Sequence, residues 1–75
     1  MTKEKFKFLK VGSIVITNGT CRQNAGIKCV VTYICEDRIW IRPIDGQKFT
    51  STDSWCSEDW NEVSYKAITL IKDWA

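Results

Sequence analysis

The sequence contains no histidine, a single proline and only four glycines among its 75 residues. Histidine is the commonest catalytic base near neutral pH and the commonest metal ligand, so its absence argues against general-base catalysis. The few prolines and glycines, together with 44% hydrophobic residues, exclude a disordered or low-complexity chain. We therefore expect a folded domain that is not an enzyme and that uses no cofactor.

Long apolar segments are also missing from the sequence. No run of about 18 apolar residues is present that could cross a membrane. The lysine-rich start MTKEKFKFLK is not followed by the stretch of about 7 to 15 apolar residues that a signal peptide needs. These absences predict a cytoplasmic protein without a membrane partner. In a reducing compartment its four cysteines are expected to be free thiols. The alternative is that they form disulfides, for which four cysteines allow three connectivities.

The net charge of +2 is too small to predict a nucleic-acid or membrane partner by itself. The charge is instead divided along the chain. Lysines crowd the first ten residues, further basic residues follow in the middle, and an acidic segment runs from Asp53 to Glu62. Such a bipolar surface suits protein recognition, because complementary patches steer docking and set its register.

The apolar pattern is that of short β-strands rich in β-branched residues, with turn residues between them. A chain of this length forms one domain, here residues 1–75, and folding buries roughly 60% of the surface that the unfolded chain exposes. Helical periodicity of useful length is absent. We predict an all-β fold with strands at Ser13–Thr17, Cys29–Glu36, Ile39–Ile44, Lys48–Thr52 and Lys66–Lys72.

The segments between these strands predict turns. Asp37-Arg38 and Asp45-Gly46 are two-residue joins, and the second is a strong hairpin signal because glycine tolerates positive φ. Ser54–Glu62 is rich in turn-forming and N-capping residues and predicts one short 3-10 or helical turn before the last strand. Phe6–Leu9 is interpreted as an extra strand or an apolar lid, and residues 1–10 otherwise as a flexible basic arm.

The stretch TNGTCRQNAGIK, residues 17–28, has three interpretations. A phosphate-binding loop requires a Lys-Ser/Thr pair or GxGxxG spacing before a helix, and this stretch has neither. Asn18-Gly19-Thr20 matches a glycosylation acceptor, which requires secretion. We therefore predict the long first hairpin loop of a small β-domain, with turns at its two glycines.

The cysteines do not form a recognisable metal motif. Gaps of eight, six and twenty-one positions separate Cys21, Cys29, Cys35 and Cys56, and none is the C-x₂₋₄-C spacing that brings two thiolates to one zinc ion. We predict no metal site, and we expect Cys29 and Cys35 to be buried as small hydrophobic residues. A reactive thiol at Cys21, beside Arg22, is a third functional hypothesis.

The order of predicted elements resembles an SH3-like small barrel: a strand, a long loop, three strands joined by tight turns, a helical turn and a closing strand. The stretch FLKVGSIVITNGTCRQNAGIKCVV is similar to the start of KOW-type SH3-like domains, with aliphatic Ile14 and Ile16 before a loop bounded by Gly19 and Gly26. Lys28 stands where KOW domains carry an aliphatic residue. The resemblance implies a five-stranded SH3-like barrel and a compact binding protein, as many phage-encoded SH3-like proteins are.

Four tryptophans in so short a chain indicate an interaction surface. If Ile39 and Ile41 point inward, Trp40 and Arg42 point outward together, and an exposed Trp beside an Arg is typical of a binding hot spot. Our leading hypothesis is an intracellular adaptor or inhibitor that binds a protein partner, as a monomer or an edge-strand homodimer. The alternative is a nucleic-acid-binding domain that uses its basic residues and Trp40. The predicted partner-binding residues are Arg22, Lys28, Arg38, Trp40, Arg42, Trp55 and Trp60.

Overall fold

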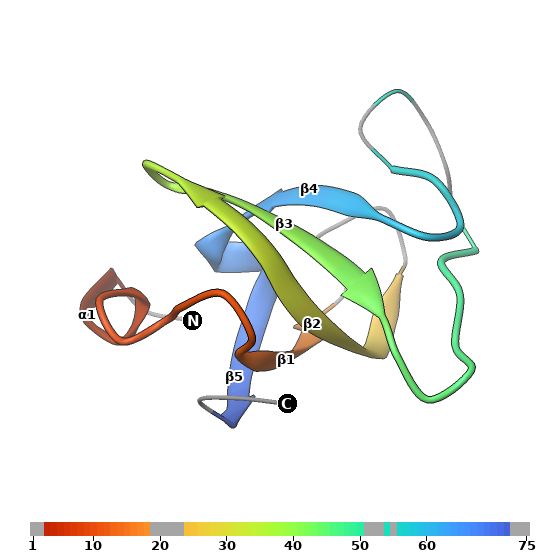
Figure 1. The fold of residues 1–75 in the computed structure, drawn as a ribbon, viewed down its shortest axis with the longest axis horizontal. Coiled ribbons are helices and arrows are strands. Elements are labelled where there is room, and N and C mark those ends of the chain that lie inside the picture. The colour runs from red at the N-terminus through yellow and green to blue at the C-terminus, as the bar shows by residue number, and fades with distance from the viewer. Residues whose placement is uncertain (1–2, 19–23, 51–53, 55, 73–75) are drawn as a thin grey trace.

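The chain folds into one antiparallel sheet of five strands (Figure 1). The computed structural model describes residues 3–18, 24–50, 54 and 56–72. Its elements are α1 (Lys3–Phe6), β1 (Ile14–Asn18), β2 (Ala25–Cys35), β3 (Arg38–Pro43), β4 (Asn61–Ser64), the 3-10 helix η1 (Tyr65–Ala67) and β5 (Ile68–Lys72). The predicted all-β class is confirmed.

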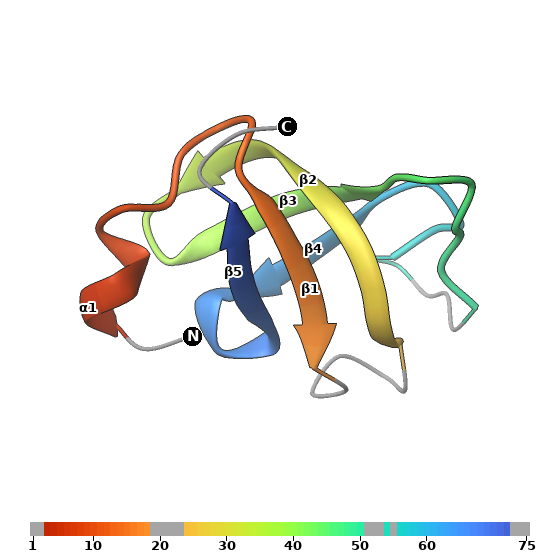
Figure 2. The same ribbon diagram turned by 90° about the horizontal axis from the view of Figure 1, so that it is seen from below.

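The strands lie in the order β4-β3-β2-β1-β5. Strand β1 therefore pairs with β2 on one side and with the last strand, β5, on the other, as Figure 2 shows from below. Strands β4 and β5 end the sheet, and within the described residues no ladder joins them. The five-stranded sheet is thus observed as an open sheet.

The core lies on the inner face of the curved sheet. Strand alternation places Ile39 and Ile41 of β3 inward with Val15 of β1 and Val31 of β2, and all four are at most 1% exposed. Full burial of an aliphatic side chain stabilises a fold by about 1.5 to 3 kcal/mol relative to its exposure. The expected inward direction of Ile39 and Ile41 is confirmed.

The predicted strand at Lys48–Thr52 is wrong for the part that is described, residues 48–50, which forms a loop. Phe49 is 2% exposed and packs into the core from this loop. Its amide donates to the Glu58 carbonyl at 3.1 Å, and the Thr50 amide donates to Asn24 Oδ1 at 2.8 Å. Loop partners therefore satisfy these amides in place of a ladder, and the fourth strand is β4.

A 3-10 turn before the last strand is confirmed, but its position differs from the prediction. It spans Tyr65–Ala67, and the described residues of Ser54–Glu62 contain no helix. Ser64 caps the turn by accepting a hydrogen bond from the Lys66 amide at 3.2 Å. Because this turn occupies Lys66 and Ala67, the last strand begins at Ile68 and not at Lys66.

The N-terminal segment begins with α1, so the predicted extra strand at Phe6–Leu9 is wrong. Phe6 stacks on Tyr65 of η1 with 5.4 Å between ring centroids, and Leu9 is buried in the core. The described part of the segment is therefore packed against the domain. No helix in the described part of the chain is long and apolar enough to cross a membrane.

The hairpin joins differ from the sequence prediction by small shifts. Asp45 and Gly46 both have positive φ, and the Gln47 amide donates to the Ile44 carbonyl at 3.1 Å, so the predicted turn is confirmed. A loop and not a strand follows Gly46, so Asp45-Gly46 does not join two strands of a hairpin. The β2–β3 join is Glu36-Asp37, one residue before the predicted Asp37-Arg38.

The segment TNGTCRQNAGIK connects the antiparallel pair β1 and β2, as predicted. Gly26 has a φ of 74°, which favours glycine, at the start of β2. The Thr17 hydroxyl accepts a hydrogen bond from the Ile27 amide at 3.0 Å and so ties the two strands together. Residues 19–23 lie outside the described residues.

An aromatic outer face as the candidate functional site

A β-bulge in β2 sets the direction of the side chains on the outer face of the sheet. Val31 pairs with Ile41 and Ile34 pairs with Ile39, so two residues of β2 oppose the single residue Trp40 of β3. The Thr32 hydroxyl donates to the Trp40 carbonyl at 3.1 Å and holds the extra residue in place. As a result Tyr33 points outward, whereas strict alternation from buried Val31 would direct it inward.

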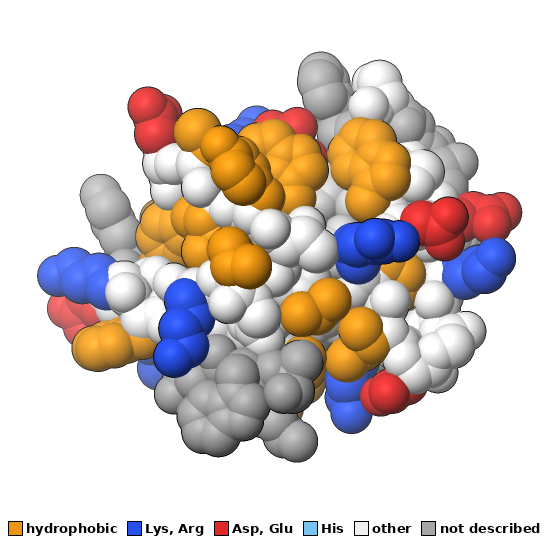
Figure 3. Space-filling model, in the orientation of Figure 1, with side chains coloured by type: hydrophobic (Ala, Val, Ile, Leu, Met, Phe, Trp, Pro, Cys, Tyr) orange, Lys and Arg blue, Asp and Glu red, His pale blue; other side chains and the backbone are white. Residues whose placement is uncertain are grey.

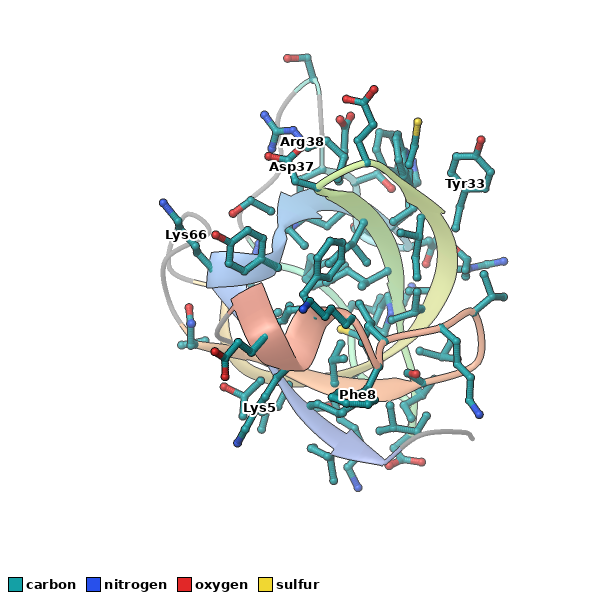
Figure 4. All side chains as sticks on the ribbon, turned by 90° about the vertical axis from the view of Figure 1, so that its left-hand side faces the viewer. Lys5, Phe8, Tyr33, Asp37, Arg38 and Lys66 are labelled. Carbon is teal, nitrogen blue, oxygen red and sulfur yellow. The ribbon has the colours of Figure 1, made fainter. Side chains whose placement is uncertain are left out.

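Tyr33 and Trp40 lie side by side on this outer face. Their ring centroids are 5.1 Å apart and their planes meet at 69°, an edge-to-face arrangement. Tyr33 is 56% exposed, and Trp40 is half-buried. Figure 4 shows Tyr33 at the right of the view, projecting away from the ribbon. The pair forms a fixed apolar surface that remains open to solvent.

Arg42 lies next to these rings, one outward position further along β3. It is exposed, and it pairs across the sheet with Val30 of β2. On the β4 side, the ladder ends at the Ile41–Asn61 pair, and Trp60 directly precedes Asn61 in the chain. Trp60 is 38% exposed. Figure 3 shows hydrophobic side chains gathered over β2, β3 and the start of β4, with basic side chains among them.

We call this surface the aromatic face and define it by the apolar and aromatic side chains, together with Arg42, on the outer side of β2 and β3 and directly before β4. They are Val30, Tyr33, Trp40, Arg42 and Trp60.

Two ion pairs lie on the same side of the sheet as the aromatic face. Arg38 Nε is 3.8 Å from Glu62 Oε1, and Glu62 is the cross-strand neighbour of Trp40. In Figure 4 the Arg38 side chain lies well apart from Tyr33. Lys28 Nζ is 3.4 Å from Asp45 Oδ2. These pairs are exposed and contribute little stability, but each offsets a basic charge with an acidic one.

The structure therefore brings together some of the predicted partner-binding residues and separates others. Trp40, Arg42 and Trp60 share the aromatic face, whereas Arg38 and Lys28 lie on the same side of the sheet in ion pairs. Arg22 and Trp55 lie outside the described residues.

Sequence reasoning missed Tyr33 because the hairpin join was placed one residue too late. With the join at Glu36-Asp37, Ile34 must face Ile39. Val31 and Ile34 are three residues apart, but their partners on β3 are only two residues apart. That mismatch of one residue is the signal that a bulge lies between them.

The cysteines form no metal centre among the described residues. Burial, and then the neighbouring Cys56, raise the pKa of the Cys29 thiol from 9.0 to about 12, so this thiol is protonated at neutral pH. The expected burial of Cys29 is confirmed, but Cys35 is exposed, because the bulge changes the direction of the residues after Val31. Cys21 lies outside the described residues.

No protein-family model, curated protein or solved structure matches this chain.

Proposed function

We propose that this chain is a non-catalytic binding module that uses the aromatic face to bind a protein partner. The observation that carries the proposal is the clustering of Tyr33, Trp40 and Trp60 around Arg42 on one exposed side of the sheet. Aromatic residues and arginine dominate the binding energy of protein interfaces. Each of these side chains stands on or directly beside a strand, so the backbone that carries it is already ordered when a partner docks.

We further propose that the fold is an SH3-like barrel. Two features support this: β5 returns to pair with β1, and a single 3-10 turn separates β4 from β5. Five strands with one 3-10 turn before the last are expected for that family from the sequence, although a loop and not a tight turn joins β3 to β4. A small inhibitor or adaptor, acting in the cytoplasm, is the role that fits such a compact binding surface.

The experiment is affinity capture from a lysate of the organism that encodes the chain. The tagged wild type is compared with Trp40→Ala, Trp60→Ala and the control Phe8→Ala. Phe8 is 71% exposed, so the control removes an exposed aromatic ring that is not part of the aromatic face. The fold of each variant is checked by circular dichroism and thermal unfolding.

We expect a partner that the wild type and Phe8→Ala retain and that Trp40→Ala and Trp60→Ala lose. Truncation of a central hot-spot residue costs about 2 kcal/mol or more, or roughly a 30-fold loss of affinity. Equal capture of the same partner by folded Trp40→Ala and Trp60→Ala would reject the aromatic face as the binding site. Capture that a nuclease treatment abolishes would favour the nucleic-acid alternative instead.

A further inference from the structure

Arg42 is the charged member of the aromatic face. Val30 is its cross-strand partner on β2, and Trp60 directly precedes Asn61, the β4 residue that pairs with the neighbouring Ile41. Its side chain is exposed, and within the described residues it forms no ion pair. A guanidinium in this position offers several donors in a fixed geometry that matches a carboxylate.

The other basic groups near the face already have acidic neighbours. Arg38 lies at 3.8 Å from Glu62, and Lys28 lies at 3.4 Å from Asp45. Among the described residues, Arg42 is therefore the basic group of this surface without an acidic partner, while the Glu62 carboxylate beside Trp40 is paired with Arg38 and the Asp45 carboxylate with Lys28. A partner complementary to this surface would present one anionic group surrounded by apolar side chains.

We propose that the partner presents a short acidic and apolar peptide segment, whose Asp or Glu carboxylate binds Arg42 while an adjacent aliphatic or aromatic side chain packs on Tyr33, Trp40 and Trp60. This inference rests on the proposed function and specifies the chemistry of its partner. A bidentate arginine–carboxylate pair sets the orientation of the segment, and the rings supply most of the apolar contact.

The same geometry disfavours a nucleic-acid strand. A strand presents a phosphate at every nucleotide, and its affinity depends on several basic contacts. Around the aromatic face Arg38 and Lys28 are already paired with the carboxylates of Glu62 and Asp45, so among the described residues Arg42 offers one anion contact where a strand needs several. The edge-to-face packing of Tyr33 and Trp40 also differs from the parallel platforms on which successive bases stack.

The test is selection from a phage-displayed library of random dodecapeptides on three immobilised proteins: the wild type, Arg42→Glu and the control Lys66→Glu. Both substitutions change the net charge by the same amount. Lys66 is exposed in η1, and Figure 4 shows it on the side of the domain opposite to Tyr33. One selected peptide is then synthesised, and its affinity for the wild type, Arg42→Gln and Trp40→Ala is measured by fluorescence anisotropy. A random single strand and a random duplex oligonucleotide are titrated in parallel.

We expect the wild type and Lys66→Glu to select peptides with Asp or Glu beside an apolar residue, and Arg42→Glu to select basic residues at that position. The synthesised peptide should bind Arg42→Gln and Trp40→Ala at least about 10-fold more weakly than the wild type. Wild-type selections without acidic enrichment, or identical selections on Arg42→Glu, would overturn the inference. Tighter binding of either oligonucleotide than of the peptide would also overturn it.

The two proposals fail in different ways. If the library yields no peptide but the lysate partner still depends on Trp40, the acidic segment is wrong and the binding face stands. If peptides bind equally to the wild type and to folded Trp40→Ala, the aromatic face itself is wrong.

Discussion

The edge-to-face contact between Tyr33 and Trp40 predicts a measurable coupling of their contributions to stability. The perturbation is a double-mutant cycle of Tyr33→Ala, Trp40→Ala and the double variant. Each single substitution removes one ring together with the contact, so the sum of the two losses of unfolding free energy includes the contact twice. The double variant loses the contact once, and the difference is the coupling energy. Because the bulge at Thr32 is what brings the rings together, the coupling also tests the register of β2 with β3.

The geometry sets the size of the coupling. Aromatic pairs with centroids 4.5–7 Å apart contribute about 0.5 to 1.5 kcal/mol beyond the area they bury. Here the centroids are 5.1 Å apart, but Tyr33 is 56% exposed, so water competes on one side of the pair. We therefore expect a coupling of about 0.5 to 1 kcal/mol, in the lower half of that range.

The assay is urea unfolding followed by tryptophan fluorescence and circular dichroism. A domain of this size unfolds with a slope of about 1 kcal/mol per molar urea, so the coupling corresponds to roughly 0.5 to 1 M in the unfolding midpoint. A cycle of Tyr33→Ala with Phe8→Ala serves as control, because Figure 4 shows these two side chains far apart. Distant substitutions should be additive within about 0.3 kcal/mol.

A Tyr33–Trp40 coupling no larger than that of the control would refute the contact. It would mean that Tyr33 does not share a face with Trp40. The bulge would then be misplaced, and the aromatic face would lose one of its three rings.

Two further predictions concern the cysteines and the β2–β3 turn. Iodoacetamide at pH 8 should modify exposed Cys35 in the folded protein and spare Cys29, whose pKa is raised to about 12. Equal labelling of the two cysteines, measured by mass spectrometry, would contradict the burial of Cys29. Above its ordinary pKa of 9.0 the Cys29 thiol loses its proton in the unfolded state but keeps it in the folded state. The contribution of this group to the unfolding free energy is therefore complete below pH 9 and falls by about 1.4 kcal/mol per pH unit towards pH 12. Urea unfolding of the wild type and Cys29→Ala over this pH range measures the loss. Glu36→Gly should raise the unfolding free energy by about 0.5 to 1 kcal/mol, because Glu36 has a φ of 56° that glycine adopts without strain. Asp37→Gly is its control, and a melting temperature that rises as much for the control would argue against strain at Glu36.

Local patterns in the sequence were sufficient to predict several parts of the fold. Alternation around Trp40 requires Ile39 and Ile41 to share one face, because side chains in a strand point to opposite sides in turn. Asp45-Gly46 predicts a turn, because few other residues adopt positive φ at low cost. Both predictions depend on neighbouring residues alone, and both are confirmed.

The fourth strand could not be predicted in the same way. Asn61–Ser64 contains one aliphatic residue, Val63, and has little strand propensity of its own. It becomes a strand because the free edge of β3 accepts it, with Val63 opposite Ile39 in the core. Phe49 shows the converse: its segment looks like a strand, yet its ring reaches the core from a loop.

The sequence by itself determined that this chain is a small all-β domain and that Trp40 and Arg42 share the side opposite the core. Only the tertiary structure decided that Tyr33 and Trp60 join them. Tyr33 points outward because the pairing of Ile34 with Ile39 leaves one extra residue in β2, and Trp60 is brought to the same end of β3 as Arg42 because Asn61 of β4 pairs with Ile41. Both depend on contacts between residues distant in the chain, which local propensity does not encode.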